Sequence, residues 1–280
     1  MDLSAALKRK VKSGQPVFGT WFNIPHPMVG EILASSGFDF ILMDGEHSPI
    51  HPDLISGLLT ATELRGTPVV YRVRSNREDL IKAALDAGVS GISVPLVHSS
   101  NDAARAVAAA KYPPLGRRGI GPWRASNYYR DYAGYVAQAN DGTILVLQIE
   151  SKEAVSEIEQ IAALPDYDVL FLGPDDLAGS MGLEIGKLHP ELLAAYRKVA
   201  AAARKFGKTM GIDLATVEYL EQYMEVGFRF FTHGADTGYL IDGAQRAVTV
   251  ARKRAVEIER NPKASKRTRG AGHRQQFRVE

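Results

Sequence analysis

The sequence predicts a closed (β/α)₈ barrel, or TIM barrel, and three observations support this fold class. Short apolar runs alternate with helical patterns along nearly the whole chain, as in parallel sheets that are covered by helices. Eight such strand-then-helix units follow one another, and about 250 residues is the usual size of this barrel. Residues 23–27, which follow the first expected strand, lack the Gly-rich loop of a dinucleotide site. The main alternative, an open doubly wound sheet, is therefore disfavoured.

The first four units occupy the N-terminal half of the chain. Val29, Ile32 and Leu33 share one face at helical spacing, so a helix is expected after the first strand. The run FDFILMD is uniformly apolar between its aspartates and predicts a buried second strand. The strands expected here cover residues 17–22, 38–44, 68–73 and 91–97, and the helices cover 27–36, 53–64, 77–86 and 101–111.

The second half resumes the same pattern after an interruption. Residues 112–140 are rich in Gly and aromatic residues and are too long for an ordinary connection. We expect them to form a functional or an interface element. The strands expected after them cover residues 143–150, 168–173, 208–213 and 228–233, and the helices cover 152–163, 190–206, 216–225 and 239–259.

Composition excludes several classes of protein. Among the 280 residues there is no cysteine, so disulfides, thiolate metal sites and cysteine nucleophiles are excluded. No apolar run approaches the ~20 residues that span a bilayer. The N-terminus lacks the apolar segment of a secretory signal. We therefore expect a cytoplasmic protein without a membrane partner.

The net charge of +2 is unevenly distributed. Residues 261–280 carry six basic residues against one acidic residue, which leaves residues 1–260 with a net charge of −3. We expect a single barrel domain over residues 1–260 and a flexible basic tail over 261–280. A nucleic-acid-binding protein would carry a basic patch on its folded domain, so no nucleic-acid partner is expected. A non-enzymatic barrel that binds an anion or nucleic acid through its tail is the least favoured interpretation.

Polar residues gather where the expected strands end, and the active site of a TIM barrel lies at that end. Helix capping explains Asp213 and Asp236 sufficiently, but it explains Glu150 and His47 poorly. Arg72 is equally compatible with a salt bridge in the barrel mouth. The polar residues at these ends are Asp44, Glu46, His47, Arg72, Arg74, Gln148, Glu150, Asp175, Asp176, Asp213, His233 and Asp236.

Oxygen ligands without thiols suit a hard divalent cation, Mg²⁺ or Mn²⁺, with Co²⁺ as a further candidate. Glu150 and Asp176 are the candidate ligands, and substrate oxygens and water would complete the shell. A 2-oxo acid chelated in this way would be activated by a Lewis acid. His47 could act as the base or position it, with Asp86 as a candidate carboxylate partner. The Gly173-Pro174 turn could bind a carboxylate through backbone N–H groups.

At these residues the sequence resembles the HpcH/HpaI family of class II, metal-dependent hydroxy-ketoacid aldolases. That family includes 2,4-dihydroxyhept-2-ene-1,7-dioate aldolase and 2-dehydro-3-deoxyglucarate aldolase. The resemblance covers roughly residues 5–255, and several motifs in the right order make it specific. The matching motifs lie in residues 37–47, 68–73, 81–88, 94–97, 111–125, 148–150 and 173–177.

The resemblance implies an aldolase that reversibly cleaves 4-hydroxy-2-oxo acids to pyruvate and an aldehyde through a metal-stabilised pyruvate enolate. Glu150 and Asp176 match the family's metal ligands. His47 and Asp86 match its catalytic histidine and the acid paired with it, and Arg72 matches the arginine at the enolate oxygen. The matched substrate-binding positions are Arg72, Gln148 near the metal, and the turn of Gly173, Pro174 and Asp175, whose backbone amides receive the pyruvate carboxylate.

The resemblance also implies a homo-oligomer, a hexamer built as a trimer of dimers, in which neighbouring subunits help to close each site. Residues 112–140 resemble the family's mobile loop near the aldehyde. The residues of interest in that loop are Arg118, Trp123, Arg124 and Tyr128.

Two positions depart from the family pattern. Asp175 stands where a small residue is usual, and Arg74 stands where an uncharged residue is common. Arg74 lies two residues after Arg72, on the same face of an extended strand, so we hypothesise that it neutralises Asp175.

Two other enzymatic mechanisms fit the sequence less well than that of a class II aldolase. A class I mechanism needs a desolvated lysine at a strand end, and Lys82, Lys111 and Lys208 are not placed there. A related lyase that acts on acyl-CoA thioesters, like the citrate lyase β subunits, would share the barrel and both carboxylates. The Gly-Glu-His sequence at residues 45–47 favours the free-acid aldolases instead.

Overall fold

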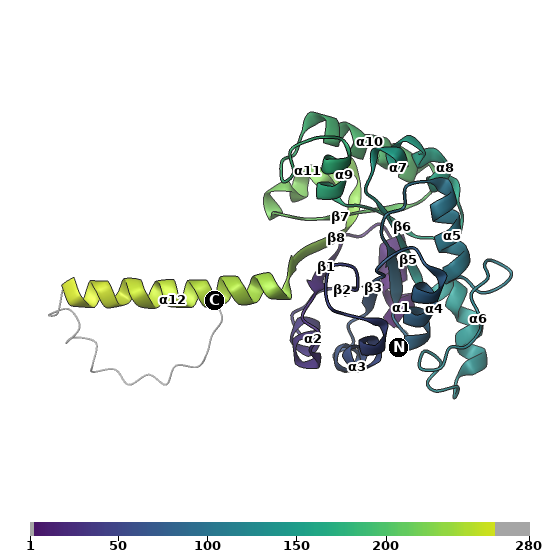
Figure 1. The fold of residues 1–280 in the computed structure, drawn as a ribbon, viewed down its shortest axis with the longest axis horizontal. Helices are drawn as coiled ribbons and strands as arrows, with labels where there is room; N and C mark the ends of the chain where they lie inside the picture. The colour runs from purple at the N-terminus through teal and green to yellow at the C-terminus, as the bar shows by residue number, and fades with distance from the viewer. Residues whose placement is uncertain (1–2, 261–280) are drawn as a thin grey trace. The chain divides into compact units, whose positions relative to one another are not determined.

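The computed structural model describes residues 3–260 and contains a closed barrel of eight parallel strands (Figure 1). Each strand pairs with the next along the chain, and β8 pairs with β1 to close the barrel. The predicted TIM barrel is confirmed, and the open sheet is excluded. The strands are β1 (Val17–Phe22), β2 (Phe40–Asp44), β3 (Val69–Arg72), β4 (Gly91–Val94), β5 (Ile144–Ile149), β6 (Val169–Leu172), β7 (Thr209–Asp213) and β8 (Phe228–Ala235).

The helices between the strands begin and end within a few residues of the expected positions. Two expected helices are broken: residues 152–163 form two short helices, and the helix expected from residue 216 begins with a 3₁₀ turn, η1 (Val217–Tyr219). The helices are α2 (Pro27–Ala34), α3 (Pro52–Glu63), α4 (Glu78–Ala87), α5 (Ser100–Ala110), α7 (Lys152–Ser156), α8 (Ile158–Ala163), α10 (Pro190–Lys205), α11 (Leu220–Val226) and α12 (Asp236–Arg260).

Three helices were not expected from the sequence. These are α1 (Leu3–Lys12), α6 (Tyr132–Gly142), which forms the end of the long interruption, and α9 (Pro174–Ser180). The last of them follows β6 directly, because Gly173 adopts an extended conformation and Pro174 is well suited to the first turn of a helix. Its first turn therefore lies at the carboxyl end of the barrel.

Successive side chains of each strand point alternately out of and into the barrel, and this alternation produces two apolar cores. One set of side chains, such as Ile41 and Leu145, packs outward against the helices. The other set fills the barrel, where the rings of Phe40 and Phe230 stack with their centroids 4.3 Å apart. A Cβ at Gly19 would lie 2.3 Å from the Phe40 ring, so only glycine fits opposite that ring. The barrel is thus a packed core and not a channel.

Helix α1 covers the amino-terminal ends of the strands. Leu7 and Val11 join the apolar core inside the barrel. Lys8 Nζ lies 3.1 Å from Asp168 Oδ1 and donates a hydrogen bond of 2.9 Å to the Thr143 carbonyl. Both residues stand at the amino-terminal ends of strands, so this pairing fixes α1 across that end of the barrel.

The chain divides by its contacts into two compact units, Met1–Asp236 and Thr237–Glu280. The prediction of a single barrel domain over residues 1–260 stays a prediction. Within α12, every residue from 239 to 260 is exposed. The predicted basic tail, residues 261–280, lies outside the described residues. No helix within residues 3–260 is both long enough and apolar enough to cross a bilayer.

Candidate active site

The last inward-facing positions of the strands are polar, in contrast to the apolar layers below them. Strand register explains which of these residues are neighbours, because Asp44 is paired with Arg72 and Asp213 with Thr232. This polar layer forms the floor of the barrel mouth, where TIM-barrel enzymes hold their substrates. Its members are Trp21, Asp44, Arg72, Ser93, Gln148, Asp213 and Thr232.

Arg72 is the central cation of the mouth and is 9% exposed. Its Nε lies 2.8 Å from Asp44 Oδ1, and one terminal nitrogen lies 3.2 Å from Glu46 Oε2. Burial alone would raise the pKa of Asp44, but hydrogen bonds from Arg72 and from the Glu46 and His47 amides hold that pKa below its ordinary value. The guanidinium is therefore held by charge-assisted contacts in one orientation.

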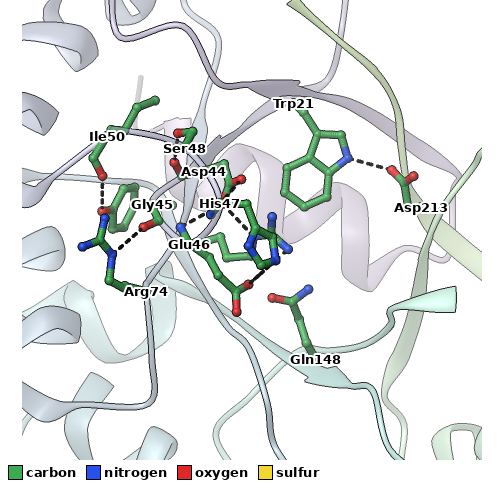
Figure 2. Close-up of polar contacts among 12 residues, drawn as sticks. Trp21, Asp44, Gly45, Glu46, His47, Ser48, Ile50, Arg74, Gln148 and Asp213 are labelled. Carbon is green, nitrogen blue, oxygen red and sulfur yellow. Dashed lines mark hydrogen bonds and ion pairs between the residues drawn. The ribbon is translucent and has the colours of Figure 1, made fainter. Parts of the chain in front are cut away.

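Trp21 completes the support of Arg72. The guanidinium carbon lies 4.3 Å from the centroid of the Trp21 ring, as in a cation–π contact. The indole Nε1 donates a hydrogen bond of 2.7 Å to Asp213 Oδ1 (Figure 2). The same carboxylate oxygen also accepts a hydrogen bond from the Thr232 hydroxyl. The capping explanation for Asp213 is therefore wrong, because this carboxylate fixes a tryptophan across the mouth.

Asp236 also has a task other than capping alone. Its Oδ2 accepts hydrogen bonds from the backbone amides of Asn23, at 3.0 Å, and Ile24, at 2.8 Å. It therefore fixes the loop that follows β1. Sequence reasoning missed this role because the partner is more than two hundred residues away in the chain.

Glu150 follows β5 and is 5% exposed. Its Oε2 accepts a hydrogen bond of 2.9 Å from the Leu96 amide, and its Oε1 accepts one of 3.0 Å from Gln148 Nε2. Leu96 has a left-handed backbone with φ of 55°, which a leucine rarely adopts, and this turn presents its amide to the carboxylate. The two contacts fix the carboxylate and leave further lone pairs on both of its oxygens.

Asp176 is brought to Glu150 by the turn into α9. Gly173 ends the strand, and a Cβ there would lie 2.7 Å from Glu150 Oε1, so the carboxylate lies against the turn itself. Burial raises the pKa of Glu150 to about 7 against the bond from Leu96, and the negative charges of Glu46 and Asp176 raise it further. Both residues therefore lie at the carboxyl end of the barrel, and their convergence on one cation stays a prediction.

Glu46 is a member of this cluster that the sequence did not single out for a role. Burial raises its pKa to about 7, against the attraction of Arg72, and the charges of Asp44 and Asp176 raise it further. A single arginine therefore faces several carboxylates. The sequence feature that could have identified Glu46 as a site residue is its position directly after a buried strand, between Gly45 and His47.

The residues present fit a hard divalent cation. Gln148 Oε1 and Ser93 Oγ are buried without a hydrogen-bond partner, on the floor of the mouth. Within residues 3–260 no group of three or more His, Cys, Asp or Glu side chains is arranged to hold a metal by itself. The protein thus offers two carboxylates, Glu150 and Asp176, to an ion whose other ligands would be oxygens of substrate and water.

His47 lies at the rim of the mouth. Its side chain is 68% exposed, and its Nε2 lies 3.7 Å from Glu46 Oε2 (Figure 2). Asp86 lies elsewhere, in the last turn of α4, where it forms an ion pair of 2.6 Å with Arg118. Helices of the barrel run opposite to the strands, so that turn is at the amino-terminal side of the barrel. The structure does not bring His47 and Asp86 of one chain together.

The long interruption also lies beside the helix ends. Arg118 is buried with its guanidinium carbon 4.3 Å from the Tyr112 ring centroid. Arg124 forms an ion pair of 2.7 Å with Glu63, the last residue of α3. The exposed rings of Trp123 and Tyr128 contact each other edge to face. These residues are therefore remote from the mouth of their own chain.

The hypothesis that Arg74 neutralises Asp175 is wrong. Arg74 Nε lies 3.4 Å from the Gly45 carbonyl, toward which it points (Figure 2). Asp175 is exposed and lines a small cavity of about 70 Å³ with Tyr196 and Tyr223. The period of two does not apply, because β3 ends at Arg72 and Asp175 belongs to a helix.

A parallel barrel with fixed carboxylates and one fixed guanidinium at its mouth is typical of α/β-barrel enzymes whose substrates are small molecules. Comparison with known proteins narrows this class. The family described as HpcH/HpaI aldolase/citrate lyase matches residues 18–243, and the chain belongs to it. The chain is therefore a carbon–carbon lyase, and its relatives support a class II pyruvate aldolase. Aldolases of this family generally depend on a divalent metal.

The relatives share most of their length with this chain. A 4-hydroxy-2-oxo-heptane-1,7-dioate aldolase of Salmonella heidelberg is 36% identical over 242 residues, which cover 86% of this chain and 92% of the relative. A family member from Burkholderia cenocepacia is 33% identical with a TM-score of 0.82, over 89% of this chain and 99% of that one. An aldolase from Desulfitobacterium hafniense is 30% identical with a TM-score of 0.81, over 88% and 96%.

Proposed function

We propose that the mouth of this barrel reversibly cleaves 4-hydroxy-2-oxo acids to pyruvate and an aldehyde. The observation that supports this most directly is that Glu150 lies against the turn at Gly173 that leads to Asp176, in the same mouth as the fixed guanidinium of Arg72. In cleavage, the bond between C3 and C4 breaks, the C4 hydroxyl loses its proton, and the electron pair of the bond passes to the pyruvate fragment. Negative charge then develops on the keto oxygen.

Each residue has a distinct role in this proposal. Glu150 and Asp176 hold Mg²⁺ or Mn²⁺, with Co²⁺ as a third candidate. When bound, the cation supplies Lewis acidity to the oxygens of the 2-oxo acid. Arg72 binds the oxygen on which charge develops, and its fixed orientation avoids reorganisation in the transition state. Gln148 orients the substrate beside Glu150. The turn of Gly173, Pro174 and Asp175 receives the pyruvate carboxylate through backbone amides.

His47 takes the proton from the C4 hydroxyl, and Asp86 orients His47. Within one chain these two residues lie at different ends of the barrel, so in this proposal Asp86 reaches His47 from a neighbouring subunit. The proposed assembly is a homo-hexamer, a trimer of dimers. Exposed apolar side chains on α12 support such an assembly. They are Tyr239, Leu240, Ile241, Val248, Val250, Val256 and Ile258.

Mixed oligomers test this assignment. His47→Ala and Asp86→Ala are each expected to be inactive alone. After the two are unfolded and refolded together, sites that combine an intact His47 with an intact Asp86 should restore about a quarter of the wild-type activity. Absence of recovery, with hexamers formed, would show that the two residues do not act across subunits.

The reaction class is tested by pyruvate release from 4-hydroxy-2-oxo acids, beginning with the heptane-1,7-dioate. EDTA should abolish turnover, and Mg²⁺ or Mn²⁺ should restore it. Borohydride with pyruvate should trap no covalent adduct, since the two buried lysines within residues 3–260, Lys8 and Lys111, lie at the other end of the barrel. A trapped lysine adduct would contradict the proposal.

The alternative is a lyase that acts on acyl-CoA thioesters, as the family description includes citrate lyases. Pyruvate release from free hydroxy-oxo acids, compared with cleavage of the corresponding CoA esters, separates the two activities. Cytoplasmic location and the lack of a nucleic-acid partner stay predictions from the sequence.

A further inference from the structure

A second polar cavity, of about 400 Å³, lies at the amino-terminal end of the barrel, remote from the mouth. It is bordered by α1, the residue after α5, the end of α6 and the residues that precede β6 and β7. We propose that this cavity binds a small oxyanion that carries at least two negative charges, such as phosphate or a phosphoryl group. The charged residues of its lining are Lys8, Lys12, Lys111, Lys208, Asp141, Asp166 and Asp168.

One ion pair in the lining is complete and needs no ligand. Lys8 Nζ lies 3.1 Å from Asp168 Oδ1 and donates to the Thr143 carbonyl. The other oxygen of Asp168 accepts a hydrogen bond of 3.0 Å from the Leu145 amide. This pair ties α1 to the strands. It contributes no net charge to the cavity.

Lys111 and Lys208 are different, because only neutral carbonyl oxygens hold their ammonium groups. Lys111 is 2% exposed and donates to the Asn140 carbonyl. Lys208 Nζ donates to the Tyr167 carbonyl at 3.1 Å and lies 3.8 Å from the centroid of the Tyr167 ring. Neither lysine forms an ion pair with a residue of the described chain. An ammonium has three N–H donors, so both retain donors for a further acceptor.

The electrostatic state of Lys111 supports an anion as the missing partner. Burial lowers its pKa to about 8, and the neighbouring charge of Lys8 lowers it further, against the attraction of Asp168, Asp166 and Asp141. A buried ammonium without a counter-ion is costly. A bound oxyanion would remove that cost and would satisfy Lys111 and Lys208 together.

The surroundings of the cavity add positive charge. A neighbouring groove of about 270 Å³ between α1 and α6 shares Lys8, Lys12 and Asp141 with the cavity and adds Arg9. Asp141 is exposed and Asp166 half-buried, so these carboxylates lie nearer to solvent than Lys111. The volume exceeds that of one phosphate ion, so a phosphorylated metabolite also fits.

The experiment titrates the full-length protein with inorganic phosphate and with pyrophosphate in metal-free buffer at low ionic strength, by calorimetry. The wild type should bind both anions, and pyrophosphate more tightly. Lys111→Met and Lys208→Met should each weaken binding by about tenfold, as expected when one charge-assisted hydrogen bond is lost. Lys208 is only half-buried, so its variant should fold even if the Lys111 variant does not.

Two controls locate the site. Lys205→Met removes an exposed lysine three residues from Lys208, which pairs with Glu159 outside the cavity, and should leave the affinity unchanged. Glu150→Gln changes only the mouth and should also leave it unchanged. No binding by the wild type, or equal affinities of the wild type and Lys208→Met, would overturn the proposal. A changed affinity in Glu150→Gln, with Lys111→Met and Lys208→Met both unchanged, would assign the anion to the mouth instead; tighter binding is the expected sign there, because one repelling carboxylate is lost.

Discussion

The two ends of the barrel carry excess charge of opposite sign. At the carboxyl ends of the strands, buried Glu150, half-buried Glu46 and exposed Asp176 share one fixed arginine, Arg72. At the amino-terminal ends, several lysines share one fixed carboxylate, that of Asp168. In each region the protein compensates only part of its own charge. The uncompensated charge is negative at the mouth and positive at the amino-terminal end. Since uncompensated charge is costly, we expect a ligand of the opposite sign at each end, a cation at the mouth and an anion at the amino-terminal end.

The direction of the helices contributes to this difference. Helix amino termini point toward the mouth and carry partial positive charge, which favours carboxylates such as Asp176 in the first turn of α9. Helix carboxyl termini point toward the other end and favour cations, and Lys111 follows the last turn of α5 directly. The common direction of the helices thus favours negatively charged side chains at the mouth and positively charged side chains at the other end.

The largest effect is expected at the mouth, where Glu150→Gln and Asp176→Asn should each lower kcat/KM by about a thousandfold. Both should also abolish the thermal stabilisation that Mg²⁺ gives to the wild type. Asp175→Asn is the matched control, because it changes the adjacent carboxylate but keeps the backbone amides of the turn. Its kcat/KM should stay within about threefold of the wild type. Equal losses for Asp175→Asn and Asp176→Asn would break the assignment of the metal ligand.

The second prediction concerns pH and has opposite signs at the two ends. The pKa of Glu150 is raised to about 7, so the folded apo-protein holds its proton more tightly than the unfolded chain. The stability that this proton gives is present in full below about pH 4.5 and is lost as the pH rises through 7. The pKa of Lys111 is lowered to about 8, so stability is regained as the pH rises above 8. Each group contributes up to about 3 kcal/mol.

Thermal unfolding in EDTA between pH 5 and 10 measures both effects, and a minimum of stability near pH 8 is expected. Glu150→Gln should reduce the slope of the acidic limb, to which Glu46 also contributes, and Lys111→Met should flatten the alkaline limb. If both variants retain the wild-type profile, neither group is responsible. Phosphate should raise the unfolding temperature of the wild type, and Lys208→Met should need about tenfold more phosphate for the same rise.

The smallest effect is expected for the support of Arg72. Trp21→Leu removes both the ring under the guanidinium and the bond to Asp213, and should lower kcat by about thirtyfold. Trp21→Phe keeps a ring and should lower kcat by about fivefold. The exchange of pyruvate methyl protons with D₂O, followed by NMR, should fall in the same order because it depends on the same developing charge. A change in KM alone would show that Trp21 only shapes the pocket.

The fold could be predicted because each strand is a short apolar run, and polar residues stand at or directly after the ends of several of these runs. The same feature identified Arg72, Gln148 and Glu150, since a residue that ends a barrel strand must lie at the mouth. Their local partners follow from register, as for Asp44 beside Arg72. No knowledge of distant contacts was needed for these residues.

The remaining features depend on contacts that sequence patterns do not carry. Trp21 and Asp213 are 192 residues apart and meet only because the barrel closes. Helix α9 is short and begins at a Gly-Pro turn, and Gly134 and Gly142 weaken the helical pattern of α6, so no periodicity predicted these two helices. Leu3, Leu7 and Val11 do recur at helical spacing in α1, so the sequence carried a signal for that helix. The Arg74 hypothesis failed because the alternation was extended beyond the last paired residue of β3. The position of Asp86 follows from helix direction, which the sequence analysis did not apply.

Helix α1 has a consequence for the order of events during turnover. The interior of the barrel is filled by side chains and α1 covers its amino-terminal end, so a substrate can reach the floor of the mouth only from the carboxyl side. In the proposed reaction, we expect the acid on this floor to bind before the aldehyde and to leave after it. Pyruvate would then be the last product released, and added aldehyde should slow its release.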